Sequence, residues 1–243
     1  MTATTARPTP ARPDGPAAGP FVAHALAALT LLVGLNVAVA TYVPFAVEGI
    51  GSSYLIMYYH VPSAIVTTLL YGFVRLAGIL YLATRNRLWD RLARAYVAAG
   101  LLANAVTLLT GSVWAKAAWN RWWDWRDPRL TSVAIMFLMY VGYAALNASV
   151  DDEEKRPRYA AVYGILAAVN IPIVKKAIEW FGMASHPKQV ATGGEITAAL
   201  SFGIVAFLAF YTAVAQWKFH RDTVRERVEA VLARVRRLEE ASA

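Results

Sequence analysis

Tryptophan is concentrated in one short stretch of this sequence. Five of the eight tryptophans fall between positions 114 and 125. Tryptophan favours membrane interfaces, but an aromatic belt is spread over many helix ends, and this cluster is not. On an ideal helix, at about 100° per residue, five indoles at these spacings would cover roughly half the circumference. The stretch therefore predicts a broad surface for a flat, apolar ligand with polar edges, formed by Trp114, Trp119, Trp122, Trp123 and Trp125.

Two histidines are candidates to hold a metal-containing ligand on that surface. His60 directly precedes an apolar run, and His186 lies in a later connection. Neutral imidazole is a common axial ligand of haem iron, and two imidazoles complete an octahedral site. The chain contains no cysteine, which excludes disulfides, thiolate metal sites, iron–sulfur ligation and the covalent attachment of c-type haem. If the chain binds haem, it must therefore do so reversibly or through histidine, and His60 and His186 are the candidates for such a site, with haem b as the expected transient cargo.

Basic residues near the same positions are candidates to bind the two propionates of haem. Arg129 follows the tryptophans, and Lys175 and Lys176 end the fifth apolar run. Snorkelling to the interface is the alternative interpretation of the two lysines. His24 and His220 fall near the opposite face and are interpreted as interfacial polar residues.

The elements that carry these residues are predicted to be transmembrane helices. Hydrophobic residues make up 58% of the chain and charged residues only 16%, against about 25% charged in soluble proteins, and apolar runs near 20 residues recur. The fifth run is short, so we expect the chain to leave the bilayer at Lys175, with Lys175–Ala184 on the surface. Arg75 lies inside the second run, where a charge marks a functional position unless it snorkels. The predicted spans are Phe21–Phe45, Val61–Thr84, Ala95–Val113, Leu130–Val150, Tyr159–Val174 and Ile196–Trp217.

Arginine and lysine are unevenly distributed between the connections, which predicts the orientation. They crowd the second and fourth connections and the segment after the sixth span, and the positive-inside rule makes this side cytoplasmic. Both termini are then cytoplasmic, and the connections with His60, the tryptophans and His186 all face outward. The predicted fold is an all-α integral membrane protein with six transmembrane helices and a tryptophan-rich periplasmic loop between helices 3 and 4. The orienting residues are Arg85, Arg87, Arg91, Arg94, Lys155, Arg156, Arg158, Lys218, Arg221 and Arg225.

A single membrane domain with a tail at each end is the predicted organisation. Residues 1–20 are rich in Pro, Ala and Thr, which predicts a disordered tail. Residues 21–217 are predicted to form the six-helix domain. Residues 218–243 are predicted to form a cytoplasmic amphipathic helix. The apolar stripe of that helix could pair with a partner helix or lie on the inner leaflet. The net charge of +8 is explained by arginines that meet anionic lipid at the ends of the spans, and no nucleic-acid-binding motif accompanies it.

A longer stretch around the tryptophans resembles a known motif. Residues 111–132, GSVWAKAAWNRWWDWRDPRLTS, resemble the tryptophan-rich haem motif of haem-handling membrane proteins. With the tetrapeptide HVPS at 60–63, the six spans and the length, the chain is similar to the CcmC family, the haem exporter protein C of cytochrome c maturation. It departs from the family at Ala115 and Asn120, where the motif usually has glycine, and at Pro187, where glutamine is usual.

The resemblance implies a function and partners. Members of the family bind haem as transient cargo at the outer face of the bacterial cytoplasmic membrane and deliver it to the haem chaperone CcmE. They work beside an ABC-type complex of CcmA, CcmB and CcmD and are not enzymes. The sequence has no Walker A motif, so any use of ATP is expected in a partner. Carried over to this chain, the metal ligands are His60 and His186, and the other haem-binding residues are Trp114, Trp119, Trp122, Trp123, Trp125, Asp127 and Arg129.

Two other functions remain open from the residues themselves. A b-type haem subunit of a quinone-linked oxidoreductase would also bind haem through histidines, but those histidines usually lie inside the spans. His60 and His186 lie at the predicted outer ends instead. A scaffold or permease subunit with an interfacial aromatic loop would carry no haem and would tolerate the loss of His60.

Overall fold

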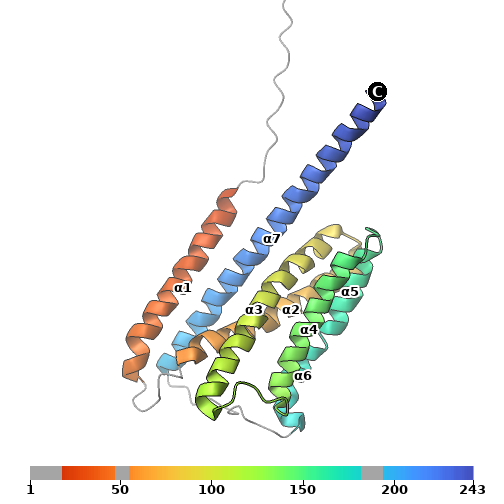
Figure 1. The fold of residues 1–243 in the computed structure, drawn as a ribbon. Helices are drawn as coiled ribbons and strands as arrows, with labels where there is room; N and C mark the ends of the chain where they lie inside the picture. The colour runs from red at the N-terminus through yellow and green to blue at the C-terminus, as the bar shows by residue number, and fades with distance from the viewer. Residues whose placement is uncertain (1–17, 47–54, 182–193, 243) are drawn as a thin grey trace, which may run out of the picture.

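The computed structural model describes residues 18–46, 55–181 and 194–242, and these residues are helical apart from short connections (Figure 1). The predicted tail 1–20 falls mostly outside the described residues, since the first helix begins at Ala18. The helices are α1 (Ala18–Ala46), α2 (Met57–Thr84), α3 (Arg87–Trp119), α4 (Pro128–Ser149), α5 (Arg156–Ala167), α6 (Asn170–Phe181) and α7 (Gly194–Ser242).

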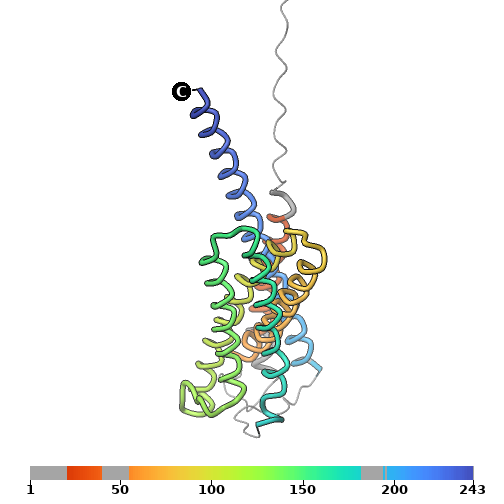
Figure 2. Tube along the Cα trace, turned by 90° about the vertical axis from the view of Figure 1, so that its right-hand side faces the viewer, coloured from red at the N-terminus to blue at the C-terminus, as the bar shows by residue number. Residues whose placement is uncertain are grey.

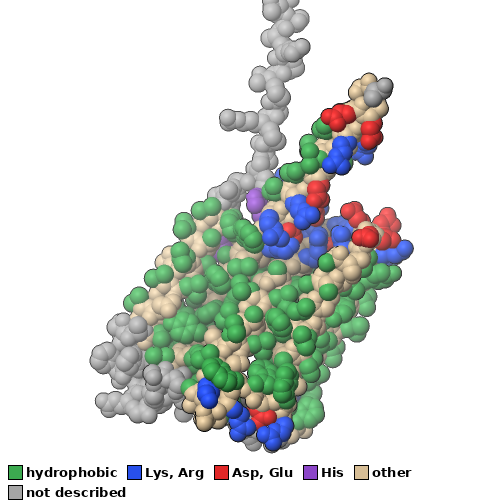
Figure 3. Space-filling view, in the orientation of Figure 1, with side chains coloured by type: hydrophobic (Ala, Val, Ile, Leu, Met, Phe, Trp, Pro, Cys, Tyr) green, Lys and Arg blue, Asp and Glu red, His purple; other side chains and the backbone are tan. Residues whose placement is uncertain are grey.

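Six segments of the described chain are long and apolar enough to cross a membrane. α1, α2, α3, α4 and α7 each supply one, and α5 and α6 together supply another over Arg156–Phe181. In Figure 3, hydrophobic side chains cover the middle of the molecule, and Lys, Arg, Asp and Glu gather toward its two ends. The prediction of an all-helical chain with six candidate spans is therefore confirmed.

Successive spans run in alternating directions, so the helix ends gather in two places (Figures 1 and 2). We name one of them the His60 end, where α2 begins, α3 ends, α4 begins and α6 ends. The other is the Arg85 end, where α2 ends, α3 begins, α4 ends and α5 begins. α7 starts at the His60 end and continues past the Arg85 end (Figure 1).

α2 is the central helix of the bundle. It packs against α3, α5 and α7, while α1 lies along α7, and α4 contacts α3, α5 and α6. Leu70 belongs to a buried cluster with residues of α1, α3 and α7, and Tyr71, the next residue, belongs to a second cluster with α3, α4 and α5. α2 thus has core on two sides, which fixes its position and that of the residues along it.

α2 begins one turn earlier than the sequence predicted. The predicted span opened near Pro62, but the helix starts at Met57 and contains both His60 and Pro62. Proline cannot donate a hydrogen bond to Tyr58, four residues back. Gly203 of α7 accommodates this irregular turn, because a Cβ there would lie 2.9 Å from Pro62 Cγ and 3.3 Å from Tyr58 O. His60 therefore lies on a helix rather than on a loop.

The fifth span differs from its prediction near its end. The chain does not stop being helical at Lys175, because α6 continues to Phe181. The interruption falls earlier, at residues 168–169. Its physical cause is Pro172, whose ring would clash with the carbonyl of residue 168 in a continuous helix. Asn170 secures the joint to α4 by donating from Nδ2 to Ser132 O at 2.9 Å.

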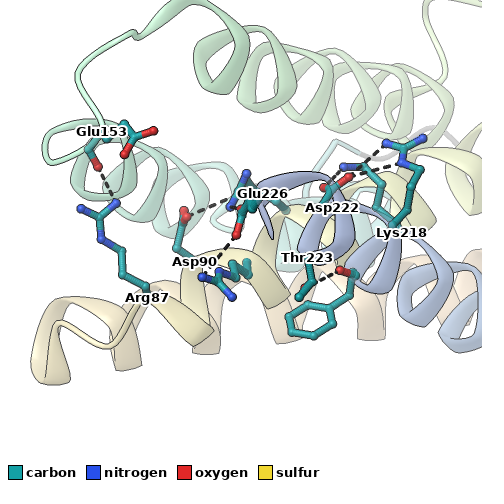
Figure 4. A network of polar contacts seen from close by, with 11 residues as sticks. Arg87, Asp90, Glu153, Lys218, Asp222, Thr223 and Glu226 are labelled. Carbon is teal, nitrogen blue, oxygen red and sulfur yellow. Dashed lines mark hydrogen bonds and ion pairs between the residues drawn. The ribbon is translucent and has the colours of Figure 1, made fainter. Parts of the chain in front are cut away.

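Charged side chains connect the helices at the Arg85 end (Figure 4). Arg94 of α3 forms ion pairs with Asp90 at 3.3 Å and with Glu226 of α7 at 3.5 Å. Arg87 donates to Glu153 O at 2.5 Å and so connects α3 to the α4–α5 connection. α7 has no break at Trp217, where the sixth span was predicted to end, and stays helical through Ser242.

Candidate functional site

A cavity of about 480 Å³ lies at the His60 end among α2, α3, α4 and α6. Its size is within the range of roughly 300–1,000 Å³ that is usual for small-molecule sites. The lining on α2 runs from Met57 to Leu69, which is about 18 Å at 1.5 Å per residue. Most lining residues are aliphatic or aromatic. The cavity therefore suits a large apolar ligand and reaches toward the middle of the spans.

His60 lines this cavity from the first turns of α2. Its Nδ1 lies 3.1 Å from Thr110 Oγ1, and the Thr110 hydroxyl donates its hydrogen to Val106 O at 2.6 Å. The hydroxyl can then only accept from His60, which puts the ring proton on Nδ1 and the lone pair on Nε2. A hydrogen bond to the other ring nitrogen is what orients an imidazole that ligates a metal. The geometry thus prepares His60 Nε2 to act as a ligand.

Gly111 of α3 gives the imidazole its space. A Cβ at Gly111 would lie 2.9 Å from His60 Cε1, which is closer than carbon atoms approach without a shift. Any other residue at this position would push the ring away from its place. The glycine that opens the tryptophan-rich stretch therefore has a steric function at the site.

The estimate that the five indoles cover half a helix circumference assumed one continuous helix. In the structure the tryptophans are divided between α3 and the connection that follows it. α3 ends at Trp119, because Asn120 adopts a left-handed conformation with a φ of 56°. Trp122, Trp123 and Trp125 lie on the connection before α4. The indoles meet in two edge-to-face pairs, Trp114 with Trp119 at 4.8 Å between centroids and Trp123 with Trp125 at 5.4 Å.

Two of the five tryptophans reach the cavity. Trp114 and Trp123 line it, and Trp123 Nε1 is buried with no hydrogen-bond partner among the described residues. Trp119 supports Trp114 from outside the lining. Trp122 and Trp125 are 58% and 71% exposed, so they face away from the cavity, where a partner or the bilayer surface can contact them.

Acidic residues order the connection between α3 and α4. Asp124 Oδ2 pairs with Arg121 Nη1 at 2.6 Å, and its Oδ1 accepts from Arg126 N at 3.0 Å. These hydrogen bonds, chiefly the one from the Arg126 backbone, lower the pKa of the Asp124 carboxyl. Asp127 is fully buried, and its Oδ1 accepts from Arg129 N at 2.9 Å at the start of α4. Asp127 is thus the N-cap that positions Arg129 and lies outside the cavity lining.

Two cations stand in the lining of an otherwise apolar cavity. Arg129 comes from the first turn of α4 and Lys175 from α6. Lys176, the other predicted candidate, pairs with Glu179 at 2.7 Å on the exposed side of α6. Of the two lysines, Lys175 therefore lines the cavity.

The deep part of the cavity was not predicted from the sequence. Asn104 and Thr107 of α3 line it together with Met136 of α4. Asn104 is fully buried. Tyr71 is its close neighbour, but neither side chain makes a well-formed hydrogen bond within the described residues. An asparagine in the middle of an apolar run was the available signal. The second predicted ligand, His186, lies outside the described residues.

Comparison with known proteins assigns this chain to a family. The sequence profile described as "Heme exporter protein C" matches residues 15–239. The chain belongs to the heme exporter protein C family. The resemblance found in the tryptophan-rich stretch is thereby confirmed.

Individual members of the heme exporter protein C family are similar to most of the chain. The protein of that name from Bradyrhizobium diazoefficiens is 34% identical over 187 residues, which cover 74% of this chain and 71% of the relative. The one from Escherichia coli K12 is 32% identical over 161 residues, 65% of each chain. A putative cytochrome c biosynthesis ccmC-like mitochondrial protein of Marchantia polymorpha is 31% identical over 160 residues, 66% of this chain and 67% of the relative.

Two departures from the motif of the heme exporter protein C family have structural explanations. Asn120 stands in a left-handed conformation, which asparagine tolerates better than most residues other than glycine. Ala115 is buried within α3, where the helical backbone needs no glycine. The substitutions therefore keep the backbone that glycine would adopt at Asn120 and favour the helix at Ala115.

Proposed function

We propose that this chain binds haem in the cavity at the His60 end and delivers it to the haem chaperone CcmE during the maturation of c-type cytochromes. The observation that carries the proposal is the cavity itself, in which His60, two indoles and two cations line an apolar space of about 480 Å³. The names of the relatives describe heme exporters, which supports haem as the cargo. The chain then acts as a haem-handling transport component rather than as an enzyme.

In this proposal each lining group has a role suited to its chemistry. His60 Nε2 ligates the iron on one side, and His186 is the proposed ligand on the other. Trp114 and Trp123 contact the porphyrin, since indoles pack well against flat aromatic rings. Arg129 and Lys175 pair with the propionates, because cations in an apolar setting attract carboxylates strongly.

The charge distribution supports an orientation with the His60 end outside. The Arg85 end carries the arginines of two connections, and the positive-inside rule then makes it cytoplasmic. The exposed Trp122 and Trp125 would face the periplasm beside the cavity. Haem held there is accessible to a periplasmic chaperone without passing through the chain. We place the protein in the bacterial cytoplasmic membrane on this basis, with both termini inside.

Partners follow from the family rather than from a surface of this chain. We propose that the chain works with CcmE and with the ABC-type subunits CcmA, CcmB and CcmD. A b-type haem subunit of a quinone-linked oxidoreductase is the competing function. It is disfavoured because His60 lies within the first turns of α2, whereas electron transfer across the bilayer would need haem held deeper in the spans.

The test is the absorption spectrum of the detergent-purified chain, expressed together with CcmE, for wild type, His60→Ala and His186→Ala. His220→Ala is the matched control, because His220 lies in the part of α7 near the Arg85 end. We expect a bis-histidine haem spectrum in wild type and in the control. Haem content should fall by about tenfold or more in the two ligand variants. Covalent haem on CcmE, measured in the same preparations, should fall in parallel.

Three results would contradict parts of this proposal. Absence of haem from wild type would reject haem binding and favour a scaffold subunit. An unchanged spectrum in His186→Ala would reject His186 as the second ligand. Haem that stays bound but never reaches CcmE, while reducing with a quinol, would favour the oxidoreductase subunit.

A further inference from the structure

Arg75 is an exposed cation in the middle part of a membrane-spanning helix. Among the described residues, neither an ion pair nor a hydrogen bond involves its guanidinium. α2 has 28 residues, so Arg75 lies about 7 Å from the helix midpoint and about 14 Å from Thr84 at 1.5 Å per residue. A charge at this depth is costly and normally has a counter-charge. The proposed haem site does not use Arg75, so its presence needs a separate explanation.

Snorkelling to the nearer interface does not explain Arg75 well. In an α-helix the Cα–Cβ bond tilts toward the N-terminus of the helix. The N-terminus of α2 is at the His60 end, so the Arg75 side chain starts away from the Arg85 end, which is the nearer surface. To reach lipid phosphate there it would have to turn back against its own Cβ direction. The geometry favours a partner at the depth of Arg75 itself.

The helix face around Arg75 is uncovered in the described chain. Leu69, Leu76 and Ile79 are 51%, 49% and 44% exposed and follow the helical spacing of one face. Between them, a Cβ at Gly72 would meet no atom within 4 Å. A small residue in the centre of an exposed apolar stripe lets another helix approach the backbone closely.

We propose that this face of α2, defined by Leu69, Gly72, Arg75, Leu76 and Ile79, binds a transmembrane helix of a different protein that carries an aspartate or glutamate opposite Arg75. The carboxylate compensates the charge of Arg75, and Gly72 allows the partner helix to approach closely. The proposal does not depend on which ligand the cavity binds.

A second copy of this chain does not fit as the occupant. None of the six predicted spans contains an aspartate or a glutamate, so a copy of the chain offers no carboxylate at the depth of Arg75. A symmetric pair of α2 helices would instead bring two arginines together. The partner is therefore a different membrane protein with an acidic residue inside a span.

The same partner helix would also bear on the cavity. Leu69 belongs both to the exposed face and to the cavity lining, and Ile65, one turn earlier and 39% exposed, lines the cavity as well. A helix packed along α2 would cover these two side chains and add a wall beside α6. The surface that recognises the partner is thus continuous with the side of the cavity.

The experiment uses the full complex in its native membrane, with the photo-crosslinking residue p-benzoylphenylalanine in place of Leu76. The same probe in place of Leu138, a 64% exposed residue of α4, is the matched control. Cross-linked peptides are identified by mass spectrometry, with and without Arg75→Glu, Arg75→Leu and Arg75→Lys. Immunoblots of the membrane fraction confirm that the variants accumulate equally.

We expect the Leu76 probe to cross-link to a span of another protein within one turn of an Asp or Glu, and the Leu138 probe not to. Arg75→Glu should lower the yield by about tenfold or more, because two like charges would face each other in the bilayer. Arg75→Leu should lower it less, and Arg75→Lys should keep it. Exchange of the partner's acid for arginine should restore the cross-link in Arg75→Glu.

The proposal is overturned if the Leu76 probe reacts only with lipid or with another copy of this chain. It is also overturned if the yield does not change in Arg75→Glu, or if the cross-linked span contains no acidic residue. Failure of the charge exchange to restore the cross-link would equally reject the pairing. None of these results depends on whether the chain retains haem.

Discussion

The Arg85 end and the His60 end of this bundle are built in opposite ways. At the Arg85 end, charged side chains are matched with one another, and Arg94 lies between Asp90 and Glu226. At the His60 end, a cavity of about 480 Å³ lies among α2, α3, α4 and α6. Buried polar atoms without a hydrogen-bond partner among the described residues occur at both ends, Trp123 Nε1 at the His60 end and Asp90 Oδ1 at the Arg85 end, so the ion pairs and the cavity make the difference.

The two ends therefore differ in function: contacts toward the Arg85 end stabilise the bundle, and the His60 end of the same helices binds the ligand in our proposal. An ion pair holds α3 to α7 at the Arg85 end, and Phe73 of α2 packs against Tyr96 of α3 with 4.2 Å between ring centroids. Toward the His60 end, α2 and α3 leave room for a ligand. A site can stay open only if the helices that line it are fixed elsewhere. Substitutions at the two ends should therefore have different consequences, one on folding and the other on haem.

The largest expected effect is on stability and comes from Arg94→Ala. It leaves Asp90, which is almost fully buried, without its ion-pair partner, and such a loss typically costs about 3–5 kcal/mol. We expect a lower melting temperature in detergent, with normal haem content in the protein that remains folded. The double variant Asp90→Asn with Arg94→Ala should recover part of the loss. Equal stability of Arg94→Ala and wild type would show that the Arg85 end does not fix the bundle.

The second effect is on haem and comes from Gly111→Ala. The added methyl group would lie 2.9 Å from His60 Cε1 and displace the imidazole, so we expect haem affinity to fall by about tenfold. The melting temperature should change little. Haem titration followed by absorbance measures the change. Gly72→Ala is the matched control, because nothing lies within 4 Å of a Cβ there, and equal haem loss in both variants would contradict the steric role of Gly111.

A smaller effect separates the tryptophans. Trp123→Phe removes part of an indole that lines the cavity, and we expect haem affinity to fall roughly fivefold, in line with the contribution of one aromatic contact. Trp122→Phe should leave affinity unchanged in the purified chain, since Trp122 is 58% exposed. If the two variants lost haem equally, the cavity would not be the haem site.

The smallest effect concerns the end of α3. Asn120→Ala should destabilise the chain by about 1 kcal/mol, because alanine adopts the left-handed conformation less readily than asparagine. Asn120→Gly should be neutral or slightly stabilising. Thermal unfolding in detergent measures both. Similar melting temperatures for Asn120→Ala and Asn120→Gly would mean that the helix end relaxes to another conformation.

Most of the fold was predictable because apolar runs of about 20 residues are a strong and local signal. The details that were not predicted involve prolines in their three-dimensional context. Pro62 is tolerated within α2 because Gly203 of α7 lies against it, and hydropathy contains no such information. Pro172 ends a helix in the middle of an apolar run, so the span looked short rather than broken.

The site was predictable in its residue types but only partly in its geometry. His60, Trp114, Trp123 and Arg129 line one cavity, as a common ligand surface required. The carboxylate of Asp127 caps α4, a structural role that was not predicted from the sequence, and its role in haem binding stays a prediction. The sequence could not separate a ligand-binding carboxylate from a capping one, since both precede a helix in the same motif.

The length of α7 determines how far apart its two ends lie. Its 49 residues form a rod of about 73 Å at 1.5 Å per residue. Gly194 starts this rod shortly after His186, and Leu238 lies near its other tip. A continuous helix of this length therefore connects Gly194 at the His60 end to a tip beyond the Arg85 end (Figure 1). The proposed second iron ligand, His186, is therefore only eight residues along the sequence from a helix whose far tip projects from the opposite side of the bundle.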